Sequence, residues 1–80
     1  MVDLTPMNIK LKIGQRVKQL RNERNISQEA LGLEAEVDRT YVSDVENGRR
    51  NVSMEILEKL IKALKVSFSE FFNSKEFSKP

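Results

Sequence analysis

The sequence contains no cysteine and no histidine. Without cysteine there is no disulfide and no thiolate metal site, so a reducing cytoplasm is the expected location. Without histidine, the commonest general base and metal ligand are missing. Nothing in the chain assembles a nucleophile, a base and oxyanion donors. We therefore expect no enzymatic activity, no cofactor and no metal.

Long apolar runs are also absent. No stretch is long enough for a transmembrane helix, and Met1-Val2-Asp3 does not begin a secretion signal, so we expect no membrane partner. Eighty residues predict one small domain with one core, spanning residues 1–80, near the lower end of what folds without help. Stability must then come from helix packing, supplemented by dimerisation.

The charges are unevenly distributed, although the net charge is only +2. Residues 10–24 hold six cations and one acid, whereas residues 29–46 hold six acids and one cation, Arg39. A protein that coats nucleic acid nonspecifically is basic throughout. This pattern instead favours a protein that meets phosphates at a few points and keeps its other faces acidic.

Residues 26–51 predict two short helices separated by a few residues. Ser27 can cap the first, which is expected at residues 28–35. Asp38 can cap the second, which is expected to run to Glu46 and to end at Asn47-Gly48. Two short helices joined by a tight turn are a helix-turn-helix unit.

The second of these helices has an apolar face and a polar face. At about 100° per residue, Val42 and Val45 lie on one side, and Val37 extends that patch. The opposite arc is entirely polar and consists of Arg39, Thr40, Ser43, Asp44 and Asn47. A solvated face is the alternative interpretation. The position inside this motif and the Arg49-Arg50 pair beyond it favour contacts with bases and phosphates.

The rest of the chain predicts three more helices, at about residues 9–23, 54–64 and 68–72. Apolar stripes support the two longer ones, comprising Ile9, Ile13, Val17 and Leu20 in the first and Met54, Leu57, Leu60, Ile61 and Leu64 in the second. Lysines and arginines, Arg16 among them, are expected to fill the remaining surface of the first. Residues 1–7 and 73–80 are expected to be flexible. The predicted fold is all-α, a compact bundle of five short helices.

All four phenylalanines lie in the last thirteen residues. They can complete the core, or some can form a self-association surface. We expect Phe68, Phe71 and Phe72 to contribute to a homodimer interface. A two-fold dimer would suit a protein that reads palindromic DNA, because each subunit presents one recognition helix.

These residues resemble the lambda-repressor-like, Cro/CI-type (XRE) helix-turn-helix regulators. The resemblance covers about residues 9–72 and rests on I-G-Q-R-V-K-Q-L-R (13–21), I-S-Q-E-A-L (26–31), V-D-R-T-Y-V-S-D-V-E-N-G-R-R-N (37–51) and L-E-K-L-I-K-A-L-K-V-S (57–67). Within that family, residues 38–51 look most like the controller proteins of restriction–modification systems. Those are small dimeric regulators that first activate and later repress their own operon.

The resemblance implies a role for each matching residue. The base-contacting positions would be Arg39, Thr40, Ser43 and Asp44. Arg39 would grip a guanine, while Asp44 would accept from a cytosine amino group or hold Arg39 in place. The DNA backbone would be contacted by Gln28, Tyr41, Asn47, Arg49, Arg50 and Asn51. Gln28 could instead brace the recognition helix, and Tyr41 could instead pack against the preceding helix.

The resemblance also implies a partly buried ion pair between Arg21 and Glu46, with a structural role. The sequence departs from the family pattern at three positions outside the predicted DNA-contacting face. Glu36 and Lys65 stand where glycine is usual, and Val52 stands where proline is usual. These departures concern loop geometry, and strain is expected at Glu36 if its backbone is left-handed.

The sequence thus predicts a dimeric, sequence-specific transcription regulator that binds an inverted repeat in double-stranded DNA. RNA polymerase is a further candidate partner. One alternative is a protein-interaction module on the same scaffold, which the acidic residues of 29–46 favour. Another is an XRE-type repressor of the phage-like or developmental kind.

Overall fold

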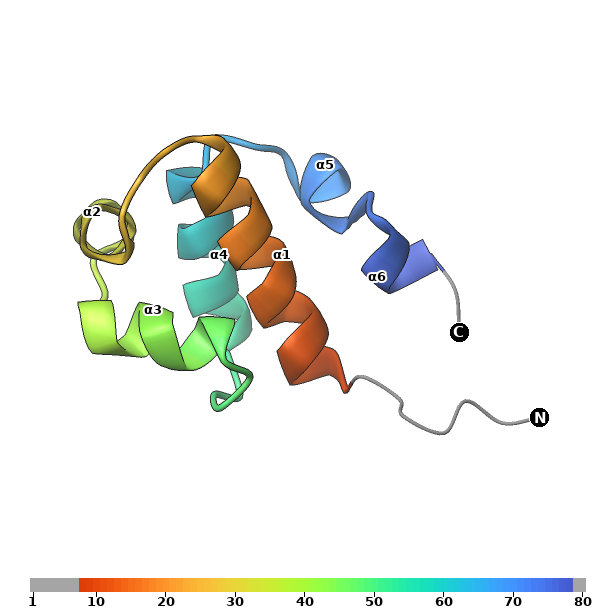
Figure 1. Cartoon of the computed structure of the whole chain (residues 1–80), viewed down its shortest axis with the longest axis horizontal. Helices are drawn as coiled ribbons and strands as arrows, with labels where there is room; N and C mark the ends of the chain where they lie inside the picture. The colour runs from red at the N-terminus through yellow and green to blue at the C-terminus, as the bar shows by residue number, and fades with distance from the viewer. Residues whose placement is uncertain (1–7, 79–80) are drawn as a thin grey trace.

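The computed structural model describes residues 8–78, and all regular secondary structure in that range is helical (Figure 1). The helices are α1 (Ile9–Glu23), α2 (Gln28–Ala35), α3 (Arg39–Glu46), α4 (Met54–Ala63), α5 (Phe68–Phe72) and α6 (Lys75–Ser78). The first five lie where the sequence predicts them, with α4 ending one residue early. The predicted flexible arm at residues 1–7 lies outside the described residues.

Side-chain caps explain where four of the helices begin. Each cap accepts a hydrogen bond of 3.0–3.1 Å from the backbone N–H three residues further on, and the four caps are Asn8, Ser27, Ser53 and Ser67. Each bond satisfies an N–H that has no partner within the helix. Asp38 occupies the cap position of α3 as predicted, but its side chain makes no capping bond.

The first four helices end in the same way. A residue with positive φ follows each helix, and the next backbone N–H donates to the carbonyl five residues earlier. The positive-φ residues are Asn25, Glu36, Gly48 and Lys65. Only one of them is glycine, and the left-handed conformation costs a residue with a Cβ atom about 1 kcal/mol. The strain expected at Glu36 is therefore present, with φ at 63°.

One cluster of buried side chains joins the first five helices. Its members are Ile13, Val17, Leu20, Leu31, Ala35, Val42, Val45, Leu60, Ile61, Ala63, Leu64 and Phe71. The apolar stripes predicted for α1 and α4 are buried or partly buried except at their first members. Ile9 and Met54 are 59% and 87% exposed, so the prediction is wrong at these two positions. Each is the first residue of its helix and projects beyond the core. None of the helices within residues 8–78 is long and apolar enough to cross a membrane.

Two glycines bring α3 close to its neighbours. A Cβ atom placed on Gly14 of α1 would lie 2.1 Å from the carbonyl oxygen of Val45. A Cβ atom on Gly32 of α2 would lie 2.7 Å from the carbonyl oxygen of Val37, just ahead of α3. Both distances are far too short for real atoms, so these positions require glycine. Gly32 therefore permits the close approach of α2 to the backbone at the start of α3.

The C-terminal segment is more ordered than the sequence predicts. Residues 75–78 form α6, which packs against α1, so the expectation of a flexible end is wrong there. Phe77 accounts for this helix, because its ring packs against two others. The ring centre of Phe77 lies 4.9 Å from that of Phe72 and 6.2 Å from that of Phe71. Phe71 itself is fully buried in the core. Its predicted place at a dimer interface is therefore wrong.

Arg16 of α1 holds this segment in place. It is buried, and its guanidinium donates to the carbonyl oxygens of Phe71 at 2.6 Å and Glu70 at 2.7 Å. These carbonyls belong to the last turn of α5, where helical carbonyls lack their usual partners. That of Glu70 also accepts a hydrogen bond from the Asn73 backbone N–H at 3.2 Å. The sequence predicts Arg16 at the surface. That prediction is wrong because the acceptors are backbone atoms more than fifty residues away, which side-chain periodicity does not reveal.

Candidate nucleic-acid interface

The α2–turn–α3 unit presents the polar arc of α3 at the surface. Arg39, Thr40 and Asn47 are exposed, and Ser43 and Asp44 are partly buried. The opposite side of α3 is buried, because Val42 and Val45 pack into the core. In Figure 1, α3 lies below α2 at the lower left edge of the bundle, and no other helix covers it in this view. The polar side chains therefore form an accessible row on a rigidly held helix.

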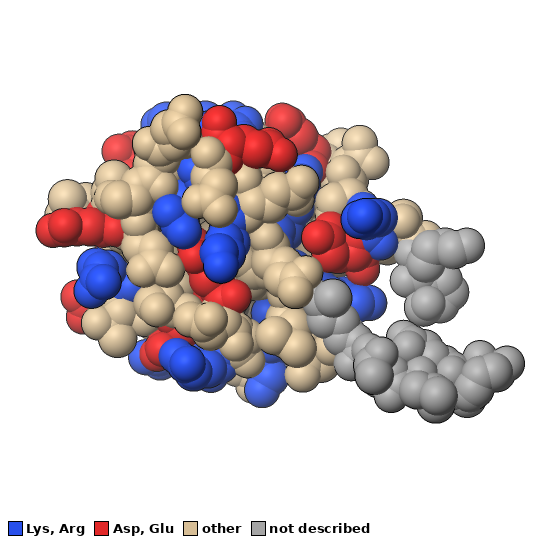
Figure 2. All heavy atoms as spheres, in the orientation of Figure 1, with Lys and Arg blue, Asp and Glu red and all other residues tan. Residues whose placement is uncertain are grey.

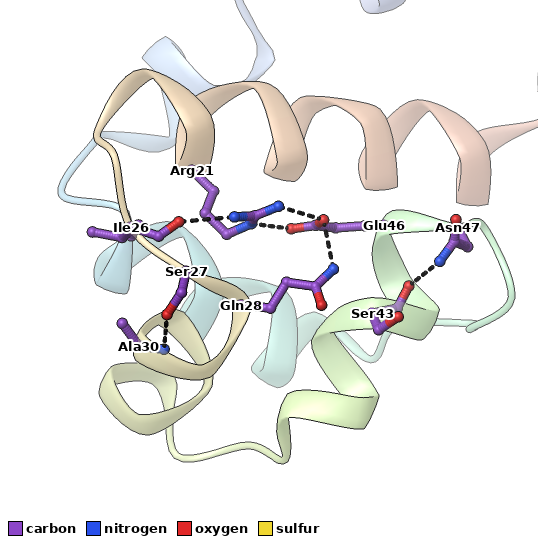
Figure 3. Close-up of polar contacts among 8 residues, drawn as sticks. All are labelled: Arg21, Ile26, Ser27, Gln28, Ala30, Ser43, Glu46 and Asn47. Carbon is purple, nitrogen blue, oxygen red and sulfur yellow. Dashed lines mark hydrogen bonds and ion pairs between the residues drawn. The ribbon is translucent and has the colours of Figure 1, made fainter.

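A network around Glu46 holds this helix in position (Figure 3). The Glu46 carboxylate accepts two hydrogen bonds from the Arg21 guanidinium, at 2.6 and 3.0 Å. It accepts a third, at 3.0 Å, from the Gln28 side-chain amide. Arg21 also donates to the carbonyl oxygen of Ile26 at 2.8 Å. The network thus joins α1, the α1–α2 loop, the start of α2 and the end of α3.

The Arg21–Glu46 pair implied by the resemblance is present and is well shielded from water. The two side chains are only 12% and 2% exposed. A charge held in such a site is stabilised only while its partner is present. Gln28 acts here as a brace, which is one of the two roles considered for it. Its amide lies at the N-terminus of α2, where a phosphate contact remains a prediction.

A second set of contacts orders the segment after α3. The Asn47 side chain donates to the carbonyl oxygen of Ser43 at 2.8 Å. The Asp44 carboxylate lies 3.4 Å from the Arg49 guanidinium and 3.5 Å from that of Arg50. Asp44 therefore pairs with these arginines, and the alternative role of holding Arg39 is not seen. Arg50 also lies over the Tyr41 ring, 4.5 Å from its centre.

Charges of both signs are mixed over the viewed face of the molecule (Figure 2). Some acids of α2 and the α2–α3 turn are paired with lysines. Glu34 lies 3.4 Å from Lys65, and Glu36 lies 3.8 Å from Lys59. These ion pairs offset part of the negative charge around α2 that favoured the interpretation as a protein-interaction module.

The C-terminal half of the bundle has exposed apolar side chains. Phe68 is 48% exposed and Phe72 is 37% exposed. Phe72 also lines a shallow, mostly apolar depression together with Ile9, Ile13 and Leu57. Asn51, predicted to contact the DNA backbone, lines the same depression and is exposed. The predicted dimer surface therefore retains two of its three phenylalanines.

The sequence and the fold match known regulators. Residues 17–71 match the family model described as Helix-turn-helix. Control protein C.BamHI from Bacillus amyloliquefaciens is 52% identical over 60 residues, which cover 74% of this chain and 74% of that protein.

Two solved structures have similar folds. The restriction–modification controller protein C.AhdI from Aeromonas hydrophila gives a TM-score of 0.75 at 43% identity, over 79% of this chain and 96% of that one. The controller protein C.Esp1396I, as a tetramer in complex with its natural 35-base-pair operator, gives a TM-score of 0.82 at 36% identity. That match covers 91% of this chain and 100% of that one. The chain belongs to the helix-turn-helix family and, within it, to the control proteins of restriction–modification systems.

Proposed function

We propose that this chain is a sequence-specific transcription regulator that binds an inverted-repeat operator as a dimer and controls a restriction–modification operon. The observation that carries the proposal is the exposed polar row of α3, held from behind by the Glu46 network. A recognition helix must enter the major groove as a rigid element, because base contacts depend on fixed geometry. Such a protein acts on DNA in the cytoplasm.

The side chains proposed to contact DNA divide into two groups. The base-contacting group comprises Arg39, Thr40, Ser43 and Asp44. The backbone-contacting group comprises Gln28, Tyr41, Asn47, Arg49, Arg50 and Asn51. Arg39 is the strongest candidate for specificity, because its planar fork can donate two hydrogen bonds to guanine O6 and N7. The arginines after α3 are suited to phosphates, which position the protein without reading sequence.

Dimerisation follows from the operator that we propose. An inverted repeat presents the same half-site twice, related by a two-fold axis, so two protomers related by that axis can read both halves. The exposed rings of Phe68 and Phe72 support a surface for this contact. The relative C.Esp1396I occupies its natural operator as a tetramer, which supports assembly of more than one protomer on DNA.

The test is a selection from a pool of random DNA duplexes at moderate salt, followed by sequencing of the bound fragments. We expect a short inverted repeat with half-site centres about 10 base pairs, or a multiple, apart. Arg39→Ala or Thr40→Ala should abolish the enrichment. Lys62→Ala, which removes an exposed cation on α4, is the matched control and should leave it intact.

Absence of any enriched motif with folded, dimeric protein would overturn the proposal. The protein-interaction module would then be preferred. Reversing the charge of Arg39, Arg49 and Arg50 separates the two functions directly. A regulator should lose its operator, whereas a module that binds its partner through α5 should retain that partner.

A further inference from the structure

The carboxylate of Asp44 sits between two functional groups of the candidate interface. It projects from α3 beside the side chains proposed to contact bases, and its side chain is 25% exposed. It also lies 3.4 Å from the Arg49 guanidinium and 3.5 Å from that of Arg50. One acid on the proposed DNA face therefore faces both arginines that are proposed to bind phosphates.

This arrangement opposes DNA binding in general. A phosphate that approaches Arg49 or Arg50 must compete with the carboxylate already there, and it meets a like charge at short range. The Arg50 guanidinium is additionally held over the Tyr41 ring, 4.5 Å from its centre. The arginines thus begin in a neutralised, ordered state, and their transfer to phosphates carries a cost on any DNA sequence.

We infer that Asp44 is a specificity-determining residue that suppresses binding to DNA lacking the operator sequence. The inference rests on the proposed function. On arbitrary DNA, the arginines leave the carboxylate for phosphates, and Asp44 then faces the groove without a donor. An unpaired carboxylate close to phosphates is unfavourable, because it loses hydrogen bonds as well as its counter-ions.

The operator can remove this penalty. In the major groove, the exocyclic amino group of cytosine is a hydrogen-bond donor that a carboxylate can accept from. A cytosine opposite Asp44 would replace the lost arginine contacts, whereas guanine and thymine offer acceptors there and would repel it. The residue therefore discriminates mainly by penalising wrong sequences, which is an effective route to specificity.

The experiment compares wild type, Asp44→Asn and Glu34→Gln. Asp44→Asn removes the charge while keeping the size of the side chain. Glu34→Gln removes the same charge from another ion pair of 3.4 Å, between α2 and Lys65, and so controls for net charge. Affinity is measured on the selected operator and on a random duplex of equal length, each at several salt concentrations.

We expect Asp44→Asn to bind the random duplex about three- to tenfold more tightly, as the loss of two exposed ion pairs implies. Its affinity should fall more steeply with salt, because the freed arginines displace additional counter-ions. Its affinity for the operator should rise less than its affinity for the random duplex, or should fall. The specificity ratio, which is the affinity for the operator divided by that for the random duplex, should therefore decrease. Glu34→Gln should leave the ratio unchanged.

A double-mutant cycle tests the mechanism. In a background in which Arg49 and Arg50 are both alanine, Asp44→Asn should strengthen random-duplex binding much less, since the carboxylate then has no arginine to neutralise. Equal loss of affinity on both duplexes would show that Asp44 merely positions the arginines and would overturn the inference. An unchanged specificity ratio would overturn it as well. The proposed function itself fails only if wild type does not prefer its selected operator.

Discussion

At the scale of single residues, Glu46 links three helices through one side chain. One carboxylate accepts hydrogen bonds from two side chains that come from different helices, and it is almost fully removed from water. Its position is determined by α3, whose exposed side carries the proposed DNA contacts. A change at this buried site should therefore affect both the free energy of unfolding and the orientation of the recognition helix.

We predict that Arg21→Met and Glu46→Leu each lower the free energy of unfolding by about 3 kcal/mol, because each leaves an unpaired charge in a shielded site. The double variant should recover much of this loss, since it leaves neither charge. Urea denaturation of the four proteins measures the cycle. Glu34→Ala, which breaks an exposed pair, is the control and should cost less than about 1 kcal/mol. Small single effects without recovery would mean that the pair contributes as a surface pair does.

At the scale of elements, local signals predict helices well and their packing partners poorly. A cap or a turn acts through residues that are close in the sequence. The starts of α2, α4 and α5 could therefore be predicted from their caps, Ser27, Ser53 and Ser67, and the C-terminus of α1 could be predicted from the turn at Asn25. Helix α6 could not be predicted, because four residues are too few for periodicity and its order depends on Phe77. The Arg21–Glu46 ion pair could be predicted only from the family resemblance, because helical periodicity alone places both residues at the surface.

The anchoring of α5 by Arg16 is an interaction of this kind and can be tested. We predict that Arg16→Met lowers the free energy of unfolding by about 3 kcal/mol, because two backbone carbonyls lose a charged donor. Amide hydrogen exchange should accelerate first in α5 and α6, with α2 and α3 least affected. Lys18→Met, an exposed cation on the same helix, is the control. Uniform acceleration across all helices would contradict a local anchoring role.

At the scale of the whole molecule, the exposed phenylalanines allow the proposed assembly to be tested separately from folding. We predict that Phe68→Ser raises the dimer dissociation constant by about tenfold or more, since each protomer loses apolar area at the interface. The stability of the protomer should change little, because this ring is already half-exposed. Sedimentation at several protein concentrations provides the measurement.

The matched control for this prediction is Leu33→Ser on α2, which is 76% exposed. It removes apolar surface from a different helix and should leave the dimer intact. Equal dissociation of both variants would indicate general loss of structure, and an unaffected Phe68→Ser dimer would place the interface elsewhere.

The glycine at position 14 has a geometric consequence for the operator. Gly14 lets α1 touch the backbone of α3, and Arg16, two residues later, fixes the same helix to the backbone of α5. The proposed DNA-contacting surface and the proposed assembly surface are thus joined through α1, which meets the backbone of α3 directly and binds the backbone of α5 through the Arg16 side chain. The separation of two recognition helices in a dimer then becomes a fixed length. One additional base pair between half-sites moves the second about 3.4 Å and turns it by about a tenth of a revolution. For the proposed dimer, the number of base pairs between the two half-sites should therefore matter as much for recognition as the bases that the side chains contact.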